Sequence, residues 1–395
     1  MPGIVVNPRS KIFHGHEWVY GTDIRKTFGN PQPGDVIALK DFKDRKIGSG
    51  IYNPHSQIVA RRFSRRTQDL DLDFFRRRIG QAIARRAAET SIDPGLCRLV
   101  SSEGDGLPGL VIDRYDAHLV LQTLTLAMEQ RIDLIVEALL AEAVPRPLSI
   151  TARNDSLIRA AEGMGTYVKA LFGDIPAPFD VVHGGLSFRV DPGAGQKTGL
   201  YLDQLANYAL VAGYAAGRRV LDCFTHQGGF ALASAMAGAE HVTGIDVSAG
   251  AIESARANAE RSGLDARRIE FGEANVFDFL KQRDAAGERY GLIILDPPSF
   301  ARNKRALGDA LRGYKEIHLR ALRMLDPGGI LATYACSHHV DREALREVVV
   351  SAAVDAKRSL RQLAAHTQRA DHPILPAIPE TEYLKGFVFE VIPSW

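Results

Sequence analysis

The sequence predicts an α/β protein of three parts: a small β-barrel-like module in residues 1–66, a middle α+β domain in residues 67–178, and a doubly wound, mostly parallel sheet in residues 179–395. Apolar runs that alternate with helical patterns predict the sheet. Short apolar alternations separated by turn formers predict the β module. A chain of 395 residues is long enough for two or three domains, each with its own core.

The predicted sheet is centred on residues 218–246, which have the pattern of a strand, a tight loop, an Ala-rich helix and a second strand. Asp222 closes the first strand and Asp246 closes the second. Ligands of such sheets bind at the carboxyl ends of the strands, so we expect these two carboxylates to face a ligand. Gly228 and Gly229 in the loop let the backbone approach that ligand closely.

The loop that starts at Asp222 indicates what this ligand is. It lacks the Gly-x-Gly-x-x-Gly spacing that cradles the pyrophosphate of a dinucleotide. An acidic residue in this loop suits a cation better than a diphosphate, and Asp246 is placed to accept hydrogen bonds from a ribose diol. These features favour S-adenosylmethionine, which carries an adenosine, an ammonium and a sulfonium but no phosphate. Another nucleotide-fold enzyme with an ordinary turn is the alternative.

Composition and charge are those of an ordinary globular protein, with 45% apolar and 24% charged residues and a net charge of +2. The charge is unevenly placed: residues 1–66 contain 12 Lys and Arg against 5 Asp and Glu, a surplus of 7. This asymmetry predicts that the first module docks on RNA or DNA. A basic surface that stays solvated is the alternative.

Cysteine usage and hydropathy indicate the compartment. The three cysteines, Cys97, Cys223 and Cys336, are scattered and form no Cys-x-x-Cys, so we expect neither a disulfide framework nor a metal site. No apolar run approaches 18 residues, and the N-terminus has no apolar signal core. We therefore expect a cytosolic protein with reduced thiols and no membrane partner. The sequence does not decide between a monomer and a homodimer.

The first module has a turn at residues 30–35 and strand patterns at 36–39, 47–52 and 57–63. It resembles the PUA-type RNA-binding domain through Gly15-His16-Glu17-Trp18-Val19-Tyr20 and Gly48-Ser49-Gly50-Ile51-Tyr52-Asn53. Trp18 is a candidate for stacking on bases, or else part of the core. A basic cluster is a candidate for contacting phosphates, or else a solvated linker face. This cluster consists of Arg61, Arg62, Arg65 and Arg66.

The middle domain shows no catalytic constellation. Its pattern predicts amphipathic helices at 67–90 and 128–142 and strands at 97–101, 109–113, 118–123 and 149–153. The last domain continues the alternation of strands and helices after a Gly-rich loop at 191–199, which we expect to fold over the cofactor or the substrate. We predict strands at 188–190, 269–271, 292–295 and 330–335, helices at 248–262 and 307–325, and a last, antiparallel strand at 386–392.

Two further residues follow predicted strands at the functional edge. Asp296 follows the strand at 292–295, and Cys336 follows the strand at 330–335. A thiolate and a carboxylic acid together suit methylation at C5 of a pyrimidine, because C5 becomes nucleophilic only after a thiolate adds at C6. A small buried cysteine that only packs is the alternative. After the strand at 269–271, the amide of Asn275 can pair with an adenine edge, its carbonyl accepting from the exocyclic amine.

Together these segments resemble the bacterial 23S ribosomal RNA large-subunit cytosine-5 methyltransferase family. That family joins a PUA domain, a middle α+β domain and a Rossmann-like class I methyltransferase domain. The matching segments run nearly end to end: Glu103-Gly104-Asp105-Gly106-Leu107-Pro108-Gly109-Leu110, Gly195-Gln196-Lys197-Thr198-Gly199, Tyr201-Leu202-Asp203-Gln204, Asp222-Cys223-Phe224, Asp296-Pro297-Pro298-Ser299-Phe300, Cys336-Ser337-His338-His339 and Asp371-His372-Pro373.

The resemblance implies an enzyme that uses S-adenosylmethionine to form 5-methylcytosine, with 23S ribosomal RNA as its partner. It implies that Cys336 is the nucleophile; Asp296, from its place after the strand at 292–295, is the candidate acid beside it. It also implies a set of residues that line the cofactor or lie beside it: Asp222, Phe224, Gly228, Asp246, Asn275, Asp296, Lys197, Thr198 and Gln204.

Three positions depart from the family pattern. Leu205 stands where an Arg is expected, and Asn275 stands where an Asp is expected. Ser299 lies where two-cysteine RNA cytosine methyltransferases have their second cysteine, so elimination must use another base. Two other classes stay open. Asp-Pro-Pro with Phe300 also resembles the loop of exocyclic-amine methyltransferases. A non-catalytic RNA-binding or ribosome-assembly protein that retains a cofactor fold is the other.

Overall fold

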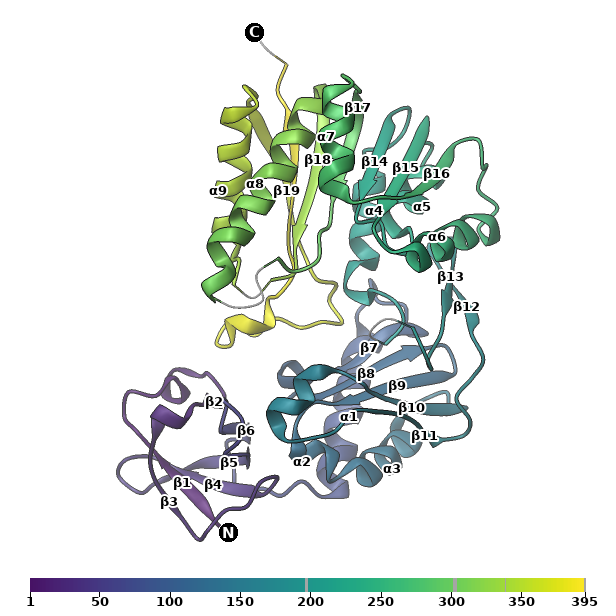
Figure 1. Ribbon diagram of the computed structural model, residues 1–395. Coiled ribbons are helices and arrows are strands. Elements are labelled where there is room, and N and C mark those ends of the chain that lie inside the picture. The colour runs from purple at the N-terminus through teal and green to yellow at the C-terminus, as the bar shows by residue number, and fades with distance from the viewer. Residues whose placement is uncertain (196–197, 301–303, 338, 394–395) are drawn as a thin grey trace. The chain divides into compact units, whose positions relative to one another are not determined.

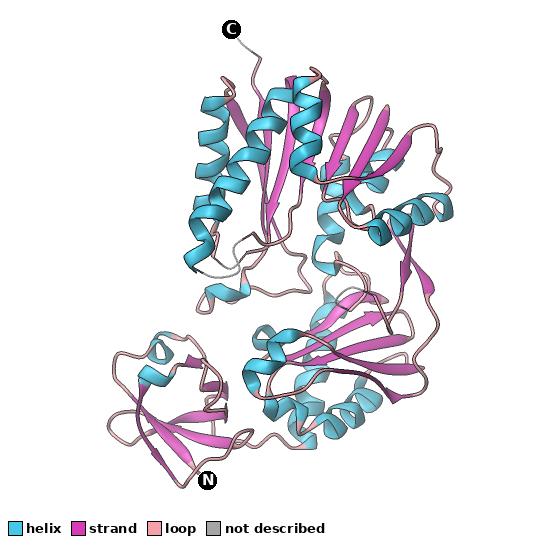
Figure 2. Ribbon diagram, in the orientation of Figure 1, coloured by secondary structure: helices cyan, strands magenta, loops and turns pink. Residues whose placement is uncertain are grey.

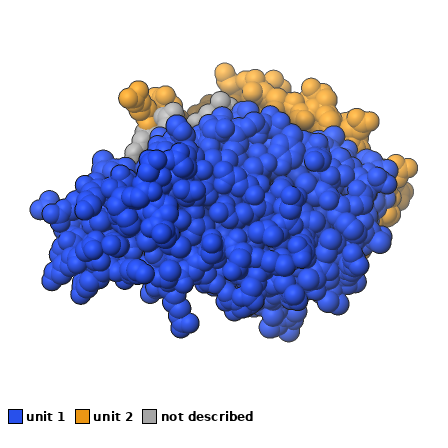
Figure 3. Space-filling view, turned by 90° about the horizontal axis from the view of Figure 1, so that it is seen from below, with its two compact units in different colours: residues 1–181, 190–202, 370–381 blue, residues 182–189, 203–369, 382–395 orange. Residues whose placement is uncertain are grey.

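The computed structural model describes residues 1–195, 198–300, 304–337 and 339–393. The chain divides into two compact units, coloured separately in Figure 3. Unit 1 contains residues 1–181, 190–202 and 370–381, and unit 2 contains residues 182–189, 203–369 and 382–395. β12 (Phe179–His183) and β13 (Leu186–Val190) form a two-stranded hairpin, of which residues 182–189 belong to unit 2; the chain then returns to unit 1 at residue 190 and enters the rest of unit 2 at residue 203.

The first part of unit 1 is a six-stranded sheet with the order β2-β6-β5-β4-β1-β3. Figure 2 shows its strands in magenta near the N-terminus. Its core contains fully buried side chains, such as Ile4, Val6, Ile37 and Leu39. The predicted strands at 36–39 and 47–52 are present, and the one predicted at 57–63 starts later, at Ala60. The strands are β1 (Gly3–Val6), β2 (Trp18–Val19), β3 (Ile24–Phe28), β4 (Val36–Lys40), β5 (Lys46–Tyr52) and β6 (Ala60–Ser64).

The second part of unit 1 is a five-stranded sheet with the order β11-β10-β9-β8-β7, against which α1 and α3 pack (Figure 1). The carboxylate of Asp71 caps α1 by accepting from the Phe74 N–H at 2.8 Å. The helix predicted at 128–142 is split, because Arg131 leaves helical geometry with φ −116° and ψ 19°. The elements are α1 (Leu72–Ala88), β7 (Leu96–Ser101), β8 (Leu110–Tyr115), β9 (His118–Thr123), α2 (Leu126–Glu129), α3 (Ile132–Glu142), β10 (Ser149–Asn154) and β11 (Tyr167–Phe172).

Unit 2 contains a seven-stranded sheet with the order β16-β15-β14-β17-β18-β20-β19. The first five strands in this order are parallel, and β20 is antiparallel to both of its neighbours, as expected for the tail. The strands are β14 (Arg219–Cys223), β15 (His241–Asp246), β16 (Ile269–Glu273), β17 (Tyr290–Leu295), β18 (Leu325–Ala335), β19 (Leu360–Thr367) and β20 (Lys385–Val391).

Helices cover both faces of this sheet, which makes it a doubly wound, Rossmann-like sheet (Figure 1). On one face, α7, α8 and α9 share a buried core with alternate residues of β17 and β18, such as Ile293 and Leu331. On the other face, Phe230 of α5 packs on Tyr334 of β18. The helices are α4 (Leu205–Ala212), α5 (Gly229–Met236), α6 (Ala249–Arg261), α7 (Val276–Ala285), α8 (Leu307–Met324) and α9 (Arg342–Asp355).

Local capping explains where several of these helices begin. Ser248 caps α6 by accepting from the Ala251 N–H at 3.3 Å, as its position before the helix predicts. Asp341 caps α9 by accepting from the Ala344 N–H at 2.8 Å. Several elements were not predicted from the sequence: β1, β2, β3, β11, β12, α7, α9 and β19. In the described part of the chain, no helix combines the length and the apolar composition needed to span a bilayer. The described residues also contain no group of three or more His, Cys, Asp or Glu side chains that could hold a metal ion.

Candidate active site at the carboxyl edge of the sheet

Polar side chains gather where four parallel strands of unit 2 end. Asp222 and Asp246 belong to the last residues of β14 and β15, and Asp296 and Cys336 directly follow β17 and β18. The strands run in matched register, with Asp222 level with Gly244 on one side and Ile294 on the other. The carboxyl ends of neighbouring strands therefore open onto one edge, where this fold binds its ligands.

Asp222 is fully buried and only half satisfied. Its Oδ2 accepts from the Thr225 hydroxyl at 2.6 Å and from the Ala231 N–H at 3.1 Å. Its Oδ1 is buried and has no hydrogen-bond partner among the described residues. Burial raises the pKa of Asp222 to about 7, and the charges of Asp296 and Asp246 act in the same direction, while the Thr225 hydroxyl opposes them. An unpaired, buried carboxylate oxygen suits a cationic donor such as an ammonium group.

The loop after β14 has an unusual backbone. Phe224 and His226 have positive φ angles of 64° and 49°, which cost energy for residues with a side chain and are common at functional sites. Gly228, with φ 87°, is the N-cap of α5. A Cβ at Gly229 would lie 2.2 Å from Cζ of Tyr208, so α4 packing explains this glycine without a ligand. The loop follows β14 at the carboxyl edge of the sheet, so its role beside the cofactor stays a prediction.

Asp246 at the end of β15 holds this loop while staying half-exposed. Its Oδ2 accepts from the His226 N–H at 3.0 Å, and its Oδ1 accepts from the Ser248 N–H at 2.9 Å. Each carboxylate oxygen has a second lone pair, so both can still accept a hydrogen bond. The arrangement fits the two hydroxyls of a ribose diol.

Asn275 follows β16 and is exposed. Its Oδ1 accepts from the Phe277 N–H at 2.9 Å and from the Asp278 N–H at 3.5 Å, which makes it the N-cap of α7. The oxygen that we expected to meet an adenine amine therefore already serves the helix. The interaction of Asn275 with adenine stays a prediction.

Asp296 is held by a chain of side-chain amides from α4 and the turn before it. Gln204 Nε2 donates to Asp296 Oδ2 at 2.9 Å, and Gln204 Oε1 accepts from Asn207 Nδ2 at 2.7 Å. Asn207 also donates to the Thr367 carbonyl at 3.0 Å. The sequence analysis placed Gln204 beside the cofactor, and in the structure its buried side chain contacts Asp296.

Cys336 is half-buried, and its Sγ lies 4.0 Å from the Pro297 carbonyl oxygen. Tyr314 of α8 lies close to it. Tyr314 is fully buried, its hydroxyl has no partner among the described residues, and the charges of Cys336 and Asp296 add to the burial that raises its pKa. Tyr314 therefore offers a hydroxyl donor beside Cys336 that no described residue uses. The sequence analysis missed Tyr314.

Phe300 is part of an aromatic cluster on the same side of the sheet. Its ring centroid lies 4.8 Å from that of Tyr314, 5.8 Å from that of Phe277 and 6.3 Å from that of Phe224. These edge and tilted contacts are typical of packed aromatic side chains. Phe300 thus forms one wall beside Asp296 and Cys336.

Two families of known domains match parts of this chain. The family of S-adenosylmethionine-dependent methyltransferases matches residues 163–372, and the family of PUA-like domains matches residues 7–65. The chain is 41% identical over 382 residues to the ribosomal RNA large subunit methyltransferase I of Shewanella denitrificans, covering 95% of each chain. It is 38% identical over 386 residues to the protein of the same name from Tolumonas auensis, covering 96% of each.

The chain belongs to the ribosomal RNA large subunit methyltransferase I family. S-adenosylmethionine is accordingly its methyl donor. Its fold is also that of SMU.776, described as a methyltransferase complexed with SAH, with a TM-score of 0.85 and 23% identity over 99% of this chain and 100% of the other. A PUA-like domain followed by a Rossmann-like methyltransferase sheet is therefore the architecture of this methyltransferase.

Two predicted cofactor residues belong to the Gly-rich loop. Lys197 lies outside the described residues. Thr198 is buried in unit 1, where its hydroxyl donates to Asp113 Oδ2 at 2.5 Å and lies 3.3 Å from the Tyr115 hydroxyl. Asp113 also accepts two hydrogen bonds from Arg98 at 2.8 and 2.9 Å. It stays a prediction that Lys197 and Thr198 contact the cofactor. It also stays a prediction that their loop folds over the cofactor or the substrate.

Three of the residues predicted to bind RNA, Trp18, Arg61 and Arg62, contact other side chains of unit 1. Trp18 Nε1 donates to Glu103 Oε1 at 2.8 Å, and Arg61 Nη1 donates to the same oxygen at 2.5 Å. The Arg61 guanidinium also lies over the Trp18 ring, 5.0 Å from its centroid. Arg62 is buried and paired with Glu17. These contacts give the three residues a structural role whether or not they also meet RNA.

The other two arginines of the cluster are exposed. The Arg65 side chain has an exposed fraction of 72% and lies 3.4 Å from Glu17 Oε1, while Arg66 extends into solvent. Because an exposed ion pair at this distance contributes little, both guanidinium groups are available to a phosphate. Of the five predicted RNA-binding residues, Arg65 and Arg66 are the ones whose contacts best fit that role.

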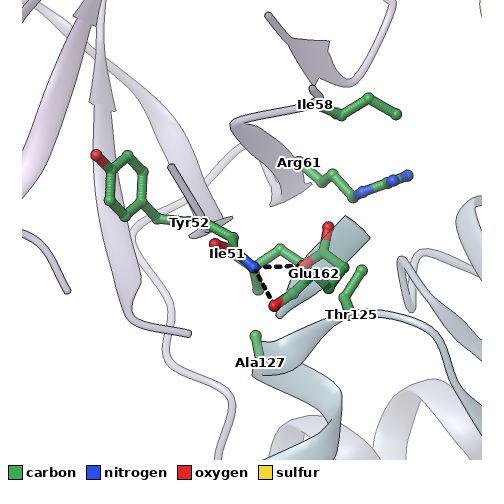
Figure 4. Close-up of a pocket in the computed structure, with 8 residues that line it drawn as sticks. Ile51, Tyr52, Ile58, Arg61, Thr125, Ala127 and Glu162 are labelled. Atoms are coloured by element: carbon green, nitrogen blue, oxygen red, sulfur yellow. Dashed lines mark hydrogen bonds between the residues drawn. The ribbon is translucent and has the colours of Figure 1, made fainter. Parts of the chain in front are cut away.

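Hydrogen bonds also join the first module to the middle part of unit 1. A small crevice lies between β5 and the turn that ends at Glu162 (Figure 4). Asn53 and Glu162 both line this crevice. Asn53 Nδ2 donates to the Glu162 backbone carbonyl at 3.0 Å and to Glu162 Oε2 at 2.8 Å. Together with the Glu103 contacts, these bonds hold the PUA-like module on the middle sheet.

Proposed function

We propose that this methyltransferase acts on 23S ribosomal RNA and methylates C5 of a cytosine through a covalent adduct with Cys336. Its relatives are named for large-subunit ribosomal RNA, and its PUA-like module carries exposed arginines. A single observation carries the choice of C5: a half-exposed thiol and a carboxyl group follow adjacent parallel strands, β18 and β17, at the functional edge.

The reaction needs these two groups because C5 of cytosine is a weak nucleophile. The Cys336 thiolate forms a bond to C6, and the electron pair of the C5–C6 double bond becomes available at C5. Asp296, steadied by Gln204, acts here in its protonated form: it donates a hydrogen bond to N3 of the bound base and so stabilises the adduct. After methyl transfer a base removes the C5 proton, the double bond reforms and the thiolate leaves. Ser299 carries no thiol, so this base is not a second cysteine.

S-adenosylmethionine supplies an electrophilic methyl group when it is bound. The residues at the edge fit this molecule. The unpaired Oδ1 of Asp222 is an acceptor for its ammonium, and Asp246 offers lone pairs to its ribose diol. Phe224 and Gly228 shape the loop beside them, and the side chain of Asn275 lies at the end of β16, where the adenine belongs.

The experiment uses an RNA that carries 5-fluorocytosine at the target position. Fluorine does not leave as a proton does, so the adduct accumulates as a covalent protein–RNA complex. We expect Cys336→Ser to lose both the complex and the methylation while binding S-adenosylmethionine normally, since the cofactor carboxylates are unchanged. Mass spectrometry of ribosomal RNA nucleosides from cells that lack the gene should show the loss of 5-methylcytosine.

The other two cysteines provide matched controls. Cys223 is fully buried, and burial raises the pKa of its thiol, which disfavours a thiolate. Cys97 is buried in the core of unit 1. Cys223→Ser and Cys97→Ser should therefore keep the covalent complex. Near-normal methylation by Cys336→Ser would remove the covalent mechanism and leave exocyclic-amine methylation with Asp296 and Phe300 as the better reading. Cofactor binding without any methyl transfer would favour an RNA-binding assembly protein.

A further inference from the structure

A buried lysine lies next to the turn that carries Cys336. Lys385 begins β20, is level with Ala335 at the end of β18, and has an exposed fraction of 5%. Its Nζ donates to the Ser337 carbonyl at 2.6 Å and to the Tyr383 carbonyl at 3.1 Å. Lysine is seldom buried without a partner charge, so its environment calls for an explanation.

The acidic side chains around Lys385 are engaged elsewhere. Glu382 pairs with Arg342 at 2.6 Å, and Asp341 caps α9. Among the described residues, the ammonium group therefore bonds to carbonyl oxygens and to no carboxylate. Burial lowers the pKa of Lys385, the Arg342 guanidinium acts in the same direction, and the charges of Glu382, Cys336 and Asp341 oppose them. The positive charge of Lys385 is therefore not neutralised by direct contact.

We propose that Lys385 is a positioning residue for Cys336: its two hydrogen bonds fix the turn after β18, and its charge stabilises the thiolate. This inference rests on the proposed function, in which that thiolate attacks C6. When the thiol ionises, its proton passes to solvent, which reaches the half-exposed Cys336.

The other groups near Cys336 make such a cation necessary. The Pro297 carbonyl oxygen lies 4.0 Å from Cys336 Sγ, and the Asp296 carboxylate follows the adjacent strand β17 at the same edge; both disfavour a second negative charge. Tyr314 from α8 contributes a neutral hydroxyl. Among the described residues, Lys385 from β20 is a cation whose charge is coupled to Cys336. Its charge offsets the repulsion between the thiolate and Asp296.

The test measures the pH dependence of Cys336 alkylation by iodoacetamide in the full-length protein, read at the Cys336 peptide by mass spectrometry. The informative variant is Lys385→Gln, because an amide keeps a hydrogen-bond donor and removes the charge. We expect its alkylation midpoint to move up by about one pH unit, which slows alkylation about tenfold near neutral pH. Lys385→Arg should restore most of the wild-type profile, since it restores the charge.

Binding of S-adenosylmethionine by each variant, measured by calorimetry, reports that the sheet is folded. A folded Lys385→Gln variant whose alkylation profile equals the wild-type profile would overturn the inference. So would failure of Lys385→Arg to recover a profile that Lys385→Gln had shifted, since the charge would then be irrelevant.

The same experiment separates this inference from the proposed function. If Cys336→Ser still methylates RNA but Lys385→Gln shifts the alkylation profile, the electrostatic coupling stands and the covalent mechanism fails. If Cys336 is essential and the profile does not shift, the proposed function stands and the role of Lys385 is wrong.

Discussion

Gln204 Nε2 donates a hydrogen bond to Asp296 Oδ2 at 2.9 Å and so fixes the carboxylate that follows β17. Gln204→Leu removes this donor. We expect kcat for RNA methylation to fall about tenfold, because a hydrogen bond to a charged group contributes about 1.5–3 kcal/mol. Single-turnover methylation, with the Kd of S-adenosylmethionine measured in parallel, checks this.

Asn207 offers a graded control, because it orients Gln204 through a 2.7 Å hydrogen bond without contacting Asp296 in the described structure. Asn207→Ala should lower kcat less than Gln204→Leu does. A Gln204→Leu variant that loses cofactor affinity with kcat unchanged would show that Gln204 serves the cofactor, as the sequence alone suggested.

The raised pKa of Asp222 predicts a pH dependence of cofactor binding. Because its pKa is about 7 in the folded protein, Asp222 is mostly protonated at pH 6 and mostly ionised at pH 8. An ammonium group prefers the ionised form, so the affinity for S-adenosylmethionine should rise about tenfold between these pH values. Calorimetry in buffers of different ionisation enthalpy should also detect release of a proton on binding near pH 6.

Asp222→Asn is the matched variant for that measurement. It should bind weakly and show a much smaller change of affinity with pH. The ligand-free variant should be more stable than wild type above pH 7. The folded wild-type protein keeps a proton on Asp222 that the unfolded chain loses, so stability from this group falls as the pH rises from about 4 to 7. A steep pH dependence that survives in Asp222→Asn would assign the titration to another group.

The sequence predicted the fold around the site well and its side-chain contacts poorly. The strands, loops and helices of residues 218–262 follow from local signals, such as the apolar runs and the Ser248 cap. Contacts between distant residues have no such signal: Gln204 and Asp296 are 92 positions apart, and Lys385 and Ser337 are 48 apart. The cap role of Asn275 was missed because the same residue also fits a base-pairing role.

The buried hydroxyl of Tyr314 allows its effect on stability to be measured separately from its effect on methylation. His318, one turn later, donates from Nδ1 to the Tyr314 carbonyl at 2.6 Å, and its Nε2 hydrogen-bonds the Thr333 hydroxyl at 2.7 Å, which holds α8 against β18. Tyr314→Phe leaves this anchor intact and removes an unpaired polar group. The ligand-free protein should keep its melting temperature or gain a few degrees, since an unsatisfied buried group costs about 1–3 kcal/mol.

If the Tyr314 hydroxyl donates to the bound base, Tyr314→Phe should also weaken methylation several-fold. Scanning calorimetry and kcat/KM for RNA measure the two effects. A variant with unchanged methylation would restrict Tyr314 to packing against Phe300.

The arginines of the PUA-like module should divide into two groups. Arg65 and Arg66 are exposed, so a double Arg65→Ala, Arg66→Ala variant should keep its melting temperature. It should bind RNA more weakly, with a less steep salt dependence, because it makes about two fewer phosphate contacts and so releases fewer counterions.

Arg61 is different, since Arg61→Ala leaves the buried Glu103 carboxylate without its guanidinium partner. It should destabilise unit 1 by about 3 kcal/mol. Filter binding at about 50–200 mM salt measures the salt dependence of RNA binding. Thermal unfolding measures the stability. An unchanged salt slope in the double variant would place the RNA contacts on other residues.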